Sequence, residues 1–252
     1  MTGSPAAALG RELDQALTAL AHRRPLLVAS DYDGVLARLR DDPSTAVPEP
    51  GVAEALARLA GVDGVTVALV SGRGVADLRA TSGLSGPYRW VGSHGAEFDG
   101  PLPADLTQRR DALAARLAPL VEATPGARLE VKPASVAVHV RQVTDPAAAT
   151  VLLDRVGQLV DSSLTRKPGK AVLELAVTDA DKGSALRRLR AELGAAGAIY
   201  LGDDVTDEDG FRALGPDDVP IKVGEGRTAA RYRVADLAGA LAVLDRLADL
   251  LS

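Results

Sequence analysis

A short apolar run followed by two carboxylates constrains this chain more than any other segment. Leu26-Leu27-Val28-Ala29 leads into Asp31-Tyr32-Asp33-Gly34. A short apolar run bounded by turn residues predicts a parallel strand that is buried on both faces. In open α/β sheets, functional groups gather beyond the carboxyl ends of such strands. An acidic pair after a strand is also typical of helix caps and solvated turns, so the pair needs support from the rest of the chain.

That support comes from three further polar groups placed next to predicted strands or helices. A second apolar run, 67–70, ends at Ser71; a third, 198–201, ends at an acidic run that begins with Asp203; and Lys182 opens a predicted helix between them. Carboxylates of this kind suit a metal-dependent attack on phosphorus, with one acid as nucleophile and its neighbour handling the proton. The order carboxylate pair, hydroxyl, lysine, carboxylate pair resembles the haloacid dehalogenase (HAD) superfamily of phosphotransferases.

Composition and charge exclude several classes of protein. The formal net charge is −5 and no basic run is present, which argues against nucleic acid or an anionic membrane surface as a partner. Cysteine is absent, so neither a disulfide framework nor a thiolate metal site can form. We see no secretory signal and no apolar stretch of about 18 residues. We therefore expect a cytoplasmic protein, and we expect a monomer.

The spacing of apolar residues predicts an α/β fold with an insertion. The pattern predicts alternating strands and helices at 1–102 and 179–252, interrupted by an α+β module at 103–178. The resemblance implies that these are a Rossmann-like HAD core with a mostly parallel sheet and an inserted α+β cap domain of the C2 type. Helices are predicted at 6–22, 48–59, 75–80, 106–122 and 146–161, and strands at 88–91, 128–132, 135–141, 164–167 and 171–177, with Pro168-Gly169 as a turn. Such a cap can close over a phosphate site and exclude water.

Polar side chains alternate along the predicted strands of the insertion. Glu130 and Lys132 share one face of a strand, and His139 and Arg141 share one face of the next. Glu174 stands between two leucines of a later strand. This pattern fits either a solvated face or a face that binds substrate.

Longer motifs narrow the resemblance. Ser93-His-Gly-Ala-Glu97, Lys132-Pro-Ala-Ser-Val-Ala-Val-His139-Val-Arg141 and Gly202-Asp-Asp-Val-Thr-Asp-Glu-Asp209 are similar to motifs of the trehalose-6-phosphate phosphatase family. The similarity extends from residue 26 to about residue 233. The chain departs from the family pattern at Val35, where the family usually carries threonine. This difference removes a hydroxyl group and leaves both acids, Asp31 and Asp33, in place.

The resemblance implies a role for each catalytic position. Asp31 attacks phosphorus and forms an aspartyl-phosphate, and Asp33 protonates the departing sugar oxygen and then accepts a proton from water. Lys182 contributes a positive charge to the phosphate and to Asp31, and Ser71 donates its hydroxyl to a phosphate oxygen.

The resemblance also implies a Mg²⁺ ion and a sugar phosphate substrate. The expected metal ligands are Asp31, the backbone carbonyl of Asp33, and Asp203. Asp204 is expected to support the metal site through water or Lys182, and Asp207 could do either job. Substrate contacts are expected from Gly34, Arg73, His94, Glu97, Lys132, His139, Arg141 and Glu174.

The remaining acids of the 203–209 run have a structural interpretation. Thr206 and Asp209 have the spacing of a variant capping box, which would make Glu208 and Asp209 structural acids in the first turn of a helix.

Other functions remain open at this stage. The catalytic groups would serve equally for sucrose 6-phosphate or mannosyl-3-phosphoglycerate, and a non-catalytic sugar-phosphate-binding domain is a further alternative. A phospho-accepting receiver domain is disfavoured, because it would be about 120 residues long, without an insertion and with no role for Asp33.

Overall fold

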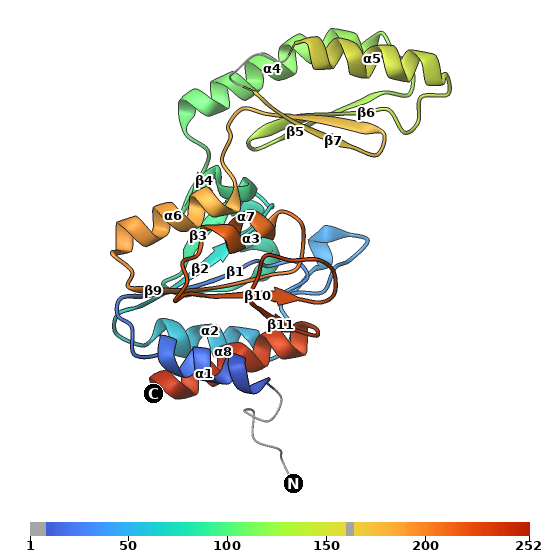
Figure 1. Ribbon diagram of the computed structural model, residues 1–252. Helices are drawn as coiled ribbons and strands as arrows, with labels where there is room; N and C mark the ends of the chain where they lie inside the picture. Colours follow the sequence, from blue (N-terminus) through green and yellow to red (C-terminus); the bar gives the residue numbers. More distant parts are fainter. Residues whose placement is uncertain (1–8, 160–163) are drawn as a thin grey trace. The chain divides into compact units, whose positions relative to one another are not determined.

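The computed structural model describes residues 9–159 and 164–252, which belong to two units (Figure 1). The core unit consists of Met1–Gly100 and Ala180–Ser252, and the inserted unit is Pro101–Asp179. The insertion expected from the sequence spans 103–178. Each unit has its own sheet and its own helices.

A seven-stranded sheet forms the centre of the core unit, with strand order β11-β10-β9-β1-β2-β3-β4. Its strands are β1 (Leu26–Ser30), β2 (Val65–Val70), β3 (Arg89–Gly92), β4 (Glu97–Phe98), β9 (Gly197–Gly202), β10 (Val219–Val223) and β11 (Tyr232–Val234). Only β4 pairs antiparallel to its neighbour. Ser30 lies opposite Leu69 of β2 and Leu201 of β9. This register places the carboxyl ends of three parallel strands side by side.

Helices cover both faces of this sheet. They are α1 (Arg11–Leu20), α2 (Val52–Ala60), α3 (Val75–Ser82), α6 (Lys182–Leu193), α7 (Asp207–Ala213) and α8 (Leu237–Leu251), with short 3-10 turns η2 (Pro43–Thr45) and η3 (Ser93–Gly95). Helices α1, α2 and α8 pack on one face, and α6 and α7 on the other (Figure 1). All five residues of β1 are buried, as expected for a central strand covered on both sides. Of the helix predicted at 6–22, residues 6–8 lie outside the described residues.

The inserted unit is an antiparallel sheet backed by two helices. Its elements are α4 (Ala104–Glu122), β5 (Arg128–Lys132), β6 (Ser135–His139), α5 (Pro146–Gln158), β7 (Thr165–Gly169) and β8 (Val172–Ala176), with strand order β5-β6-β8-β7. Buried residues of the helices, such as Leu117 and Val156, provide its core together with Val136, Val138 and Leu175 of the strands. Of the helix predicted at 146–161, residues 160 and 161 lie outside the described residues.

Two predicted strand ends in this unit were wrong. Strand β6 ends at His139, so Arg141 lies in the turn that follows and not on the strand. Pro168 and Gly169 belong to β7, and the turn is formed by Lys170 and Ala171. A proline is tolerated there because β7 is an edge strand. Proline has no backbone N–H, and on the open side of an edge strand there is no neighbouring strand to which that N–H would donate.

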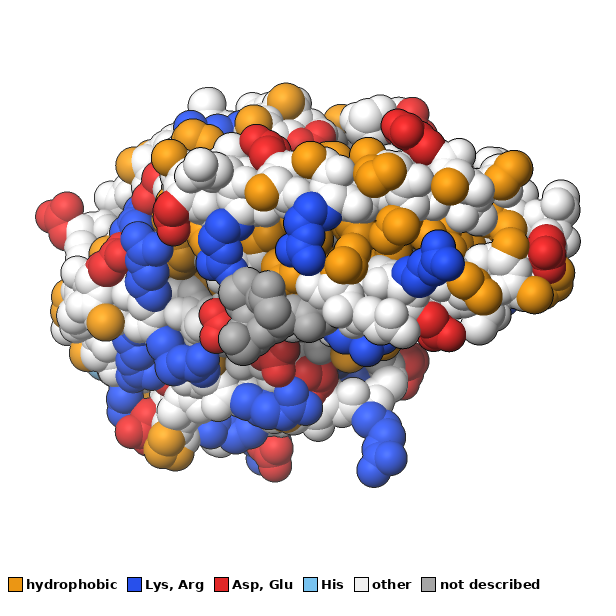
Figure 2. Space-filling model, turned by 90° about the horizontal axis from the view of Figure 1, so that it is seen from above, with side chains coloured by type: hydrophobic (Ala, Val, Ile, Leu, Met, Phe, Trp, Pro, Cys, Tyr) orange, Lys and Arg blue, Asp and Glu red, His pale blue; other side chains and the backbone are white. Residues whose placement is uncertain are grey.

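Charged side chains are mixed on the surface. On the face shown in Figure 2, Lys and Arg side chains are interspersed with Asp and Glu side chains, as the small net charge leads one to expect. Among the described helices, none combines the length and the apolar character that a membrane span requires.

Candidate active site

The carboxyl ends of β1 and β9 bring three carboxylates together. Asp31 follows β1, and its backbone N–H donates to the carbonyl of Leu201 at 2.8 Å. Carboxylate oxygens of Asp31, Asp203 and Asp207 lie within 4.8 Å of one another. Three acids at this spacing repel one another unless positive charge is placed among them.

Asp31 is the most tightly held of the three. Its carboxylate accepts hydrogen bonds from the Tyr32 backbone N–H at 2.6 Å and from the Lys182 Nζ at 2.7 Å. Burial raises the pKa of Asp31 to about 7, a shift that Lys182 opposes and Asp207 reinforces. The side chain is therefore fixed in direction, and its charge depends on the lysine beside it.

Lys182 is placed by the helix that it begins. Asp181 and Ser184 form a capping box at the start of α6, so the first residue of the helix points back toward the strand ends. The Lys182 side chain is 2% exposed and bridges Asp31 and Asp207, each at 2.7 Å. Burial alone would lower its pKa, but the two carboxylates raise the pKa to about 12. Lys182 therefore stays charged inside the protein.

Asp207 is the hub of this site. It accepts four hydrogen bonds, from Lys182, from the Tyr200 hydroxyl and from the backbone N–H groups of Asp203 and Asp204. A carboxylate has about four lone-pair positions, so the protein itself fills them. Burial raises the pKa of Tyr200 well above its usual value, and nearby Asp207 adds to the shift, so the phenol remains a donor.

Asp203 differs from Asp207 because its carboxylate accepts no hydrogen bond from any described residue. Burial raises the pKa of Asp203 to about 6, and the charge of Asp207 adds to that shift. Its backbone carbonyl accepts from the buried Lys222. Gly34 lies directly against the carboxylate, in the left-handed region at φ 78°, and a Cβ at this position would overlap Asp203. Glycine is thus required for the close approach of the two loops.

Asp33 is held by Arg73 and not by the carboxylate cluster. The guanidinium donates to both Asp33 oxygens, at 2.7 and 2.8 Å, and also to Asp77 at 3.0 Å and to the Pro43 carbonyl at 2.7 Å. It lies 5.9 Å from the centre of the Tyr32 ring. With its donors used in this way, Arg73 orients Asp33 in this structure and does not extend toward a ligand.

Three further predicted residues lie beside the cluster. The Ser71 hydroxyl is buried and accepts from the Arg73 backbone N–H at 3.1 Å, which leaves its hydrogen to donate. The His94 ring packs against Gly72. Glu97 is buried and accepts from the Ser93 hydroxyl at 2.6 Å and from the Val75 N–H at the start of α3. Glu97 therefore ties η3 to α3.

The acidic run after β9 is arranged differently from the prediction in two respects. Thr206 has helical backbone angles and makes no side-chain cap, so the predicted capping box with Asp209 was wrong. The exposed Asp204 accepts from the Val205 N–H, whereas Lys182 pairs with Asp207. Of the two acids left open for contact with Lys182, the structure shows Asp207.

The donor set of this cluster fits a cation. Asp31, Asp203 and Asp207 carry three acidic groups, of which Lys182 pairs with Asp31 and Asp207, while the buried Lys222 contacts the backbone carbonyl of Asp203. Burial opposes the ionisation of Asp31 and Asp203, and a hard cation with oxygen ligands relieves both the repulsion and the loss of water. The residues present could therefore hold a metal ion.

In the inserted unit, polar residues form two separate pairs on one face of the sheet. Lys132 contacts Glu174 at 2.6 Å, and Ser135 donates to the same carboxylate at 2.8 Å. Burial opposes ionisation of Glu174, yet its two donors keep its pKa lowered. His139 pairs with Glu130 at 2.7 Å. Arg141 lies beyond the strand and joins neither pair among the described residues.

Sequence reasoning missed two residues and underrated a third. Tyr200 and Lys222 support the acidic loop, but both lie within apolar strands where nothing in a single sequence distinguishes them from core residues. Asp207 is one of five acidic residues in the segment 203–209, and residue type alone does not distinguish it from the other four. Its position four residues after Asp203, on the first turn of α7, was the available signal.

We predict that Asp207→Asn lowers the free energy of unfolding by about 3–5 kcal/mol, because it removes one partner of a buried ion pair and turns an amide donor toward other donors. Urea denaturation measures this. Asp209→Asn is the matched control: its pair with Arg212 is exposed, so the expected loss is below about 1 kcal/mol. Equal losses of unfolding free energy in the two variants would show that the buried contacts of Asp207 do not stabilise the site.

A second prediction concerns Gly34. Gly34→Ala and Gly83→Ala both place a Cβ on a residue with positive φ, which costs about 1 kcal/mol in each case. Gly83 has open space around it, whereas Gly34 abuts Asp203. Calorimetric titration with a divalent cation should show an affinity loss of about tenfold to 100-fold for Gly34→Ala alone. Equal affinities of the two variants would contradict the placement of Asp203 in a metal site.

Comparisons with known proteins agree with this geometry. A family model described as trehalose-phosphatase matches residues 29–237. The trehalose-phosphate phosphatase of Mycobacterium marinum is 35% identical over 92% of this chain and 66% of its own length. This chain thus spans about two thirds of that relative.

Solved structures show the same fold. The trehalose-6-phosphate phosphatase of Aspergillus fumigatus superposes with a TM-score of 0.77 at 25% identity, covering 96% of this chain and 98% of that one. A HAD superfamily phosphatase from Bacteroides thetaiotaomicron superposes with a TM-score of 0.54 at 16% identity, covering 85% and 91%. The fold is therefore the predicted HAD fold, and the chain belongs to the trehalose-phosphatase family.

Proposed function

We propose that this chain is a phosphatase that hydrolyses trehalose 6-phosphate to trehalose and phosphate through an aspartyl-phosphate. The observation that carries the proposal is Asp31, fixed at the end of β1 with Lys182 at 2.7 Å. Family membership and the named activity of the relatives support the choice of substrate.

Asp31 is proposed as the nucleophile. The Tyr32 N–H holds one of its oxygens and Lys182 the other, so the carboxylate is oriented before a substrate arrives. Lys182 lowers the repulsion between this carboxylate and a phosphoryl group, and the Ser71 hydroxyl is available to donate to a phosphoryl oxygen. Lys182 stays in place because Asp207 holds it from the other side.

Asp33 is proposed as the acid and then the base. In the structure both oxygens of its carboxylate accept hydrogen bonds from Arg73. To protonate the departing sugar oxygen, Asp33 must leave the guanidinium and carry a proton taken up from solvent; the carboxylate that remains then accepts a proton from the water that hydrolyses the intermediate. Arg73 is thus proposed to position Asp33 and not to contact the sugar.

We propose Mg²⁺ as the metal ion. Asp31, the Asp33 carbonyl and Asp203 would hold it, with Asp204 supporting the site through water; Asp207, whose lone pairs are filled, would order the loop that carries Asp203. When bound, Mg²⁺ supplies positive charge that neutralises the carboxylates and polarises the phosphoryl group.

We propose that the polar face of the inserted unit recognises the sugar. Lys132 and Glu174 form a charged pair with Ser135 beside it, and such groups donate to and accept from sugar hydroxyls. This face is the feature that would separate trehalose 6-phosphate from sucrose 6-phosphate or mannosyl-3-phosphoglycerate. A non-catalytic binding domain is disfavoured because all four catalytic positions carry competent residues.

Phosphate release measured across a panel of sugar phosphates tests the proposal. Trehalose 6-phosphate should be the best substrate. Asp31→Asn should abolish turnover with folding intact, because a carboxamide does not attack phosphorus, and Asp33→Asn should lower kcat by about 10²–10⁴-fold. Turnover by Asp31→Asn within tenfold of the parent would remove Asp31 as the nucleophile.

Activity should depend on Mg²⁺ and be inhibited by Ca²⁺. Mg²⁺ requires short octahedral bonds, whereas Ca²⁺ takes longer bonds and more ligands, which would misplace Asp31 relative to phosphorus. The measurement is phosphate release in chelator followed by addition of each cation. Full activity in excess chelator would contradict the assignment of a metal ion to this site.

Lys132→Ala and Glu174→Ala should raise KM for the disaccharide phosphate strongly, because each leaves the other charge unpaired and removes contacts to hydroxyls. Hydrolysis of a small aryl phosphate should stay nearly unaltered. Lys170→Ala, at an exposed turn of the same unit, is the control and should change neither substrate. Equal losses with both substrates would assign Lys132 and Glu174 to catalysis or folding.

A further inference from the structure

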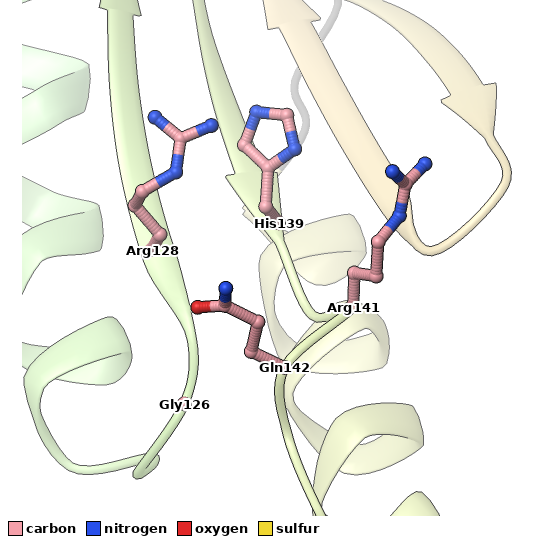
Figure 3. A pocket seen from close by; sticks show the side chains of 5 residues that line it. All are labelled: Gly126, Arg128, His139, Arg141 and Gln142. Atoms are coloured by element: carbon pink, nitrogen blue, oxygen red, sulfur yellow. The ribbon is translucent and has the colours of Figure 1, made fainter.

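The inserted unit contains a pocket that the proposed mechanism does not use. It has a volume of about 380 Å³ and is lined by Gly126, Arg128, His139, Arg141 and Gln142. Figure 3 shows the guanidinium groups of Arg128 and Arg141 on either side of the His139 ring, with the Gln142 carboxamide below them. Every lining residue belongs to the inserted unit, so the pocket is complete within it.

The pocket lies at the opposite end of the β5–β6 ladder from Lys132, and Glu174 lies at the middle of β8, opposite Ala137. In the antiparallel register of β5 and β6, Arg128 lies opposite His139 at one end of the ladder, and Lys132 lies opposite Ser135 at the other end. Arg128 and Lys132 are four residue steps apart along an extended strand, or about 13 Å. Near Lys132, the Ala134 carbonyl accepts from the Val177 N–H, where the chain leaves the unit. The pocket is therefore a second site and not an extension of the Lys132–Glu174 pair.

The lining carries an excess of positive charge and of hydrogen-bond donors. Two arginines, a histidine and an amide line the pocket, and none of the five lining residues is acidic. Glu130, on the same face of β5, pairs with His139 at 2.7 Å and only distantly with Arg128 at 3.5 Å. Arg141 has no ion pair within the described part of the chain. At least one guanidinium is thus left to bind a ligand.

The backbone fixes the floor of this pocket. Gly126 has φ 87°, and a Cβ there would overlap the carbonyl of Gln142. Only glycine allows the loop before β5 to lie directly on the loop after β6. This contact holds Arg128, the first residue of β5, and Arg141, in the turn after β6, around one space.

We propose that this pocket binds an oxyanion of the phosphate type. Guanidinium groups pair in bidentate fashion with phosphate oxygens, and a tetrahedral anion offers enough acceptors for two arginines, the histidine and the amide together. The volume holds a phosphoryl group with a small organic part. The shared chemistry fits two sources, free inorganic phosphate or the phosphoryl group of a sugar phosphate.

Amide NMR of the full, ¹⁵N-labelled chain tests the site. Inorganic phosphate and glucose 6-phosphate are titrated separately, with chloride at equal ionic strength as the charge control. We expect saturable shifts of the Gly126 and Gln142 amides with phosphate compounds and not with chloride. Tighter binding of glucose 6-phosphate assigns the site to phosphate monoesters, and equal or tighter binding of inorganic phosphate assigns it to the free ion.

Single substitutions locate the binding. Arg128→Gln and Arg141→Gln should each weaken it by about tenfold or more, and Arg141→Lys by less. Arg116→Gln, which removes an exposed charge from α4 of the same unit, should have no effect. The Ser71 and Gly202 amides report on the core unit separately, so loss of the proposed catalytic function would not imitate loss of this site. Absence of a saturable shift, or the same shift in Arg141→Gln, would overturn the proposal.

Discussion

The buried contact between Lys182 and Asp207 is the interaction on which the rest of the site depends. It joins the first residue of α6 to the first residue of α7, and through Asp207 it also fixes Tyr200 of β9 and the two backbone N–H groups after that strand. Because a buried charge without a partner is very costly, neither residue can move without the other. The pair therefore contributes to the direction of Asp31, through Lys182, and to the conformation of the loop that carries Asp203, through Asp207.

The same pair sets the charge of the site. Asp207 uses its carboxylate to hold Lys182 and the loop, and Lys182 also pairs with Asp31, whereas the Asp203 carboxylate makes no ion pair with a described residue and feels Lys182 and Lys222 only from a greater distance. Burial raises the pKa of both Asp31 and Asp203, to about 7 and about 6. The protein has thus built a space in which two carboxylates are desolvated and only one is paired. A divalent cation with oxygen ligands would relieve this imbalance, which is a physical argument for the proposed metal site that does not rely on family membership.

Much of the fold and the principal carboxylate of the site could be predicted, because both follow from local patterns. The apolar run before Asp31 marks a buried strand, and parallel strands bring their carboxyl ends together, so Asp31, Ser71 and Asp203 were found from neighbouring residues alone. Tyr200 and Lys222 could not be found, since their partners lie in other elements and no periodicity marks a buried polar group. The turn at Lys170–Ala171 was missed because Pro168-Gly169 has strong turn propensity, which the edge position of β7 overrides. Contacts between residues that are distant in the chain cannot be derived from a single sequence.

Arg73 illustrates why residue type and location did not fix a role. An arginine beside a phosphate site is expected to bind the ligand, yet its donors are used by Asp33, Asp77 and the Pro43 carbonyl. Arg141 shows the reverse case, because it lies away from the residues with which the sequence grouped it and keeps its guanidinium for the pocket beside Arg128 and His139. In both cases the number of donors already satisfied decides whether a charged side chain orients the protein or recognises a ligand. By this criterion we assign Arg73 to the internal structure of the core unit, and Arg141 to the proposed oxyanion pocket of the inserted unit.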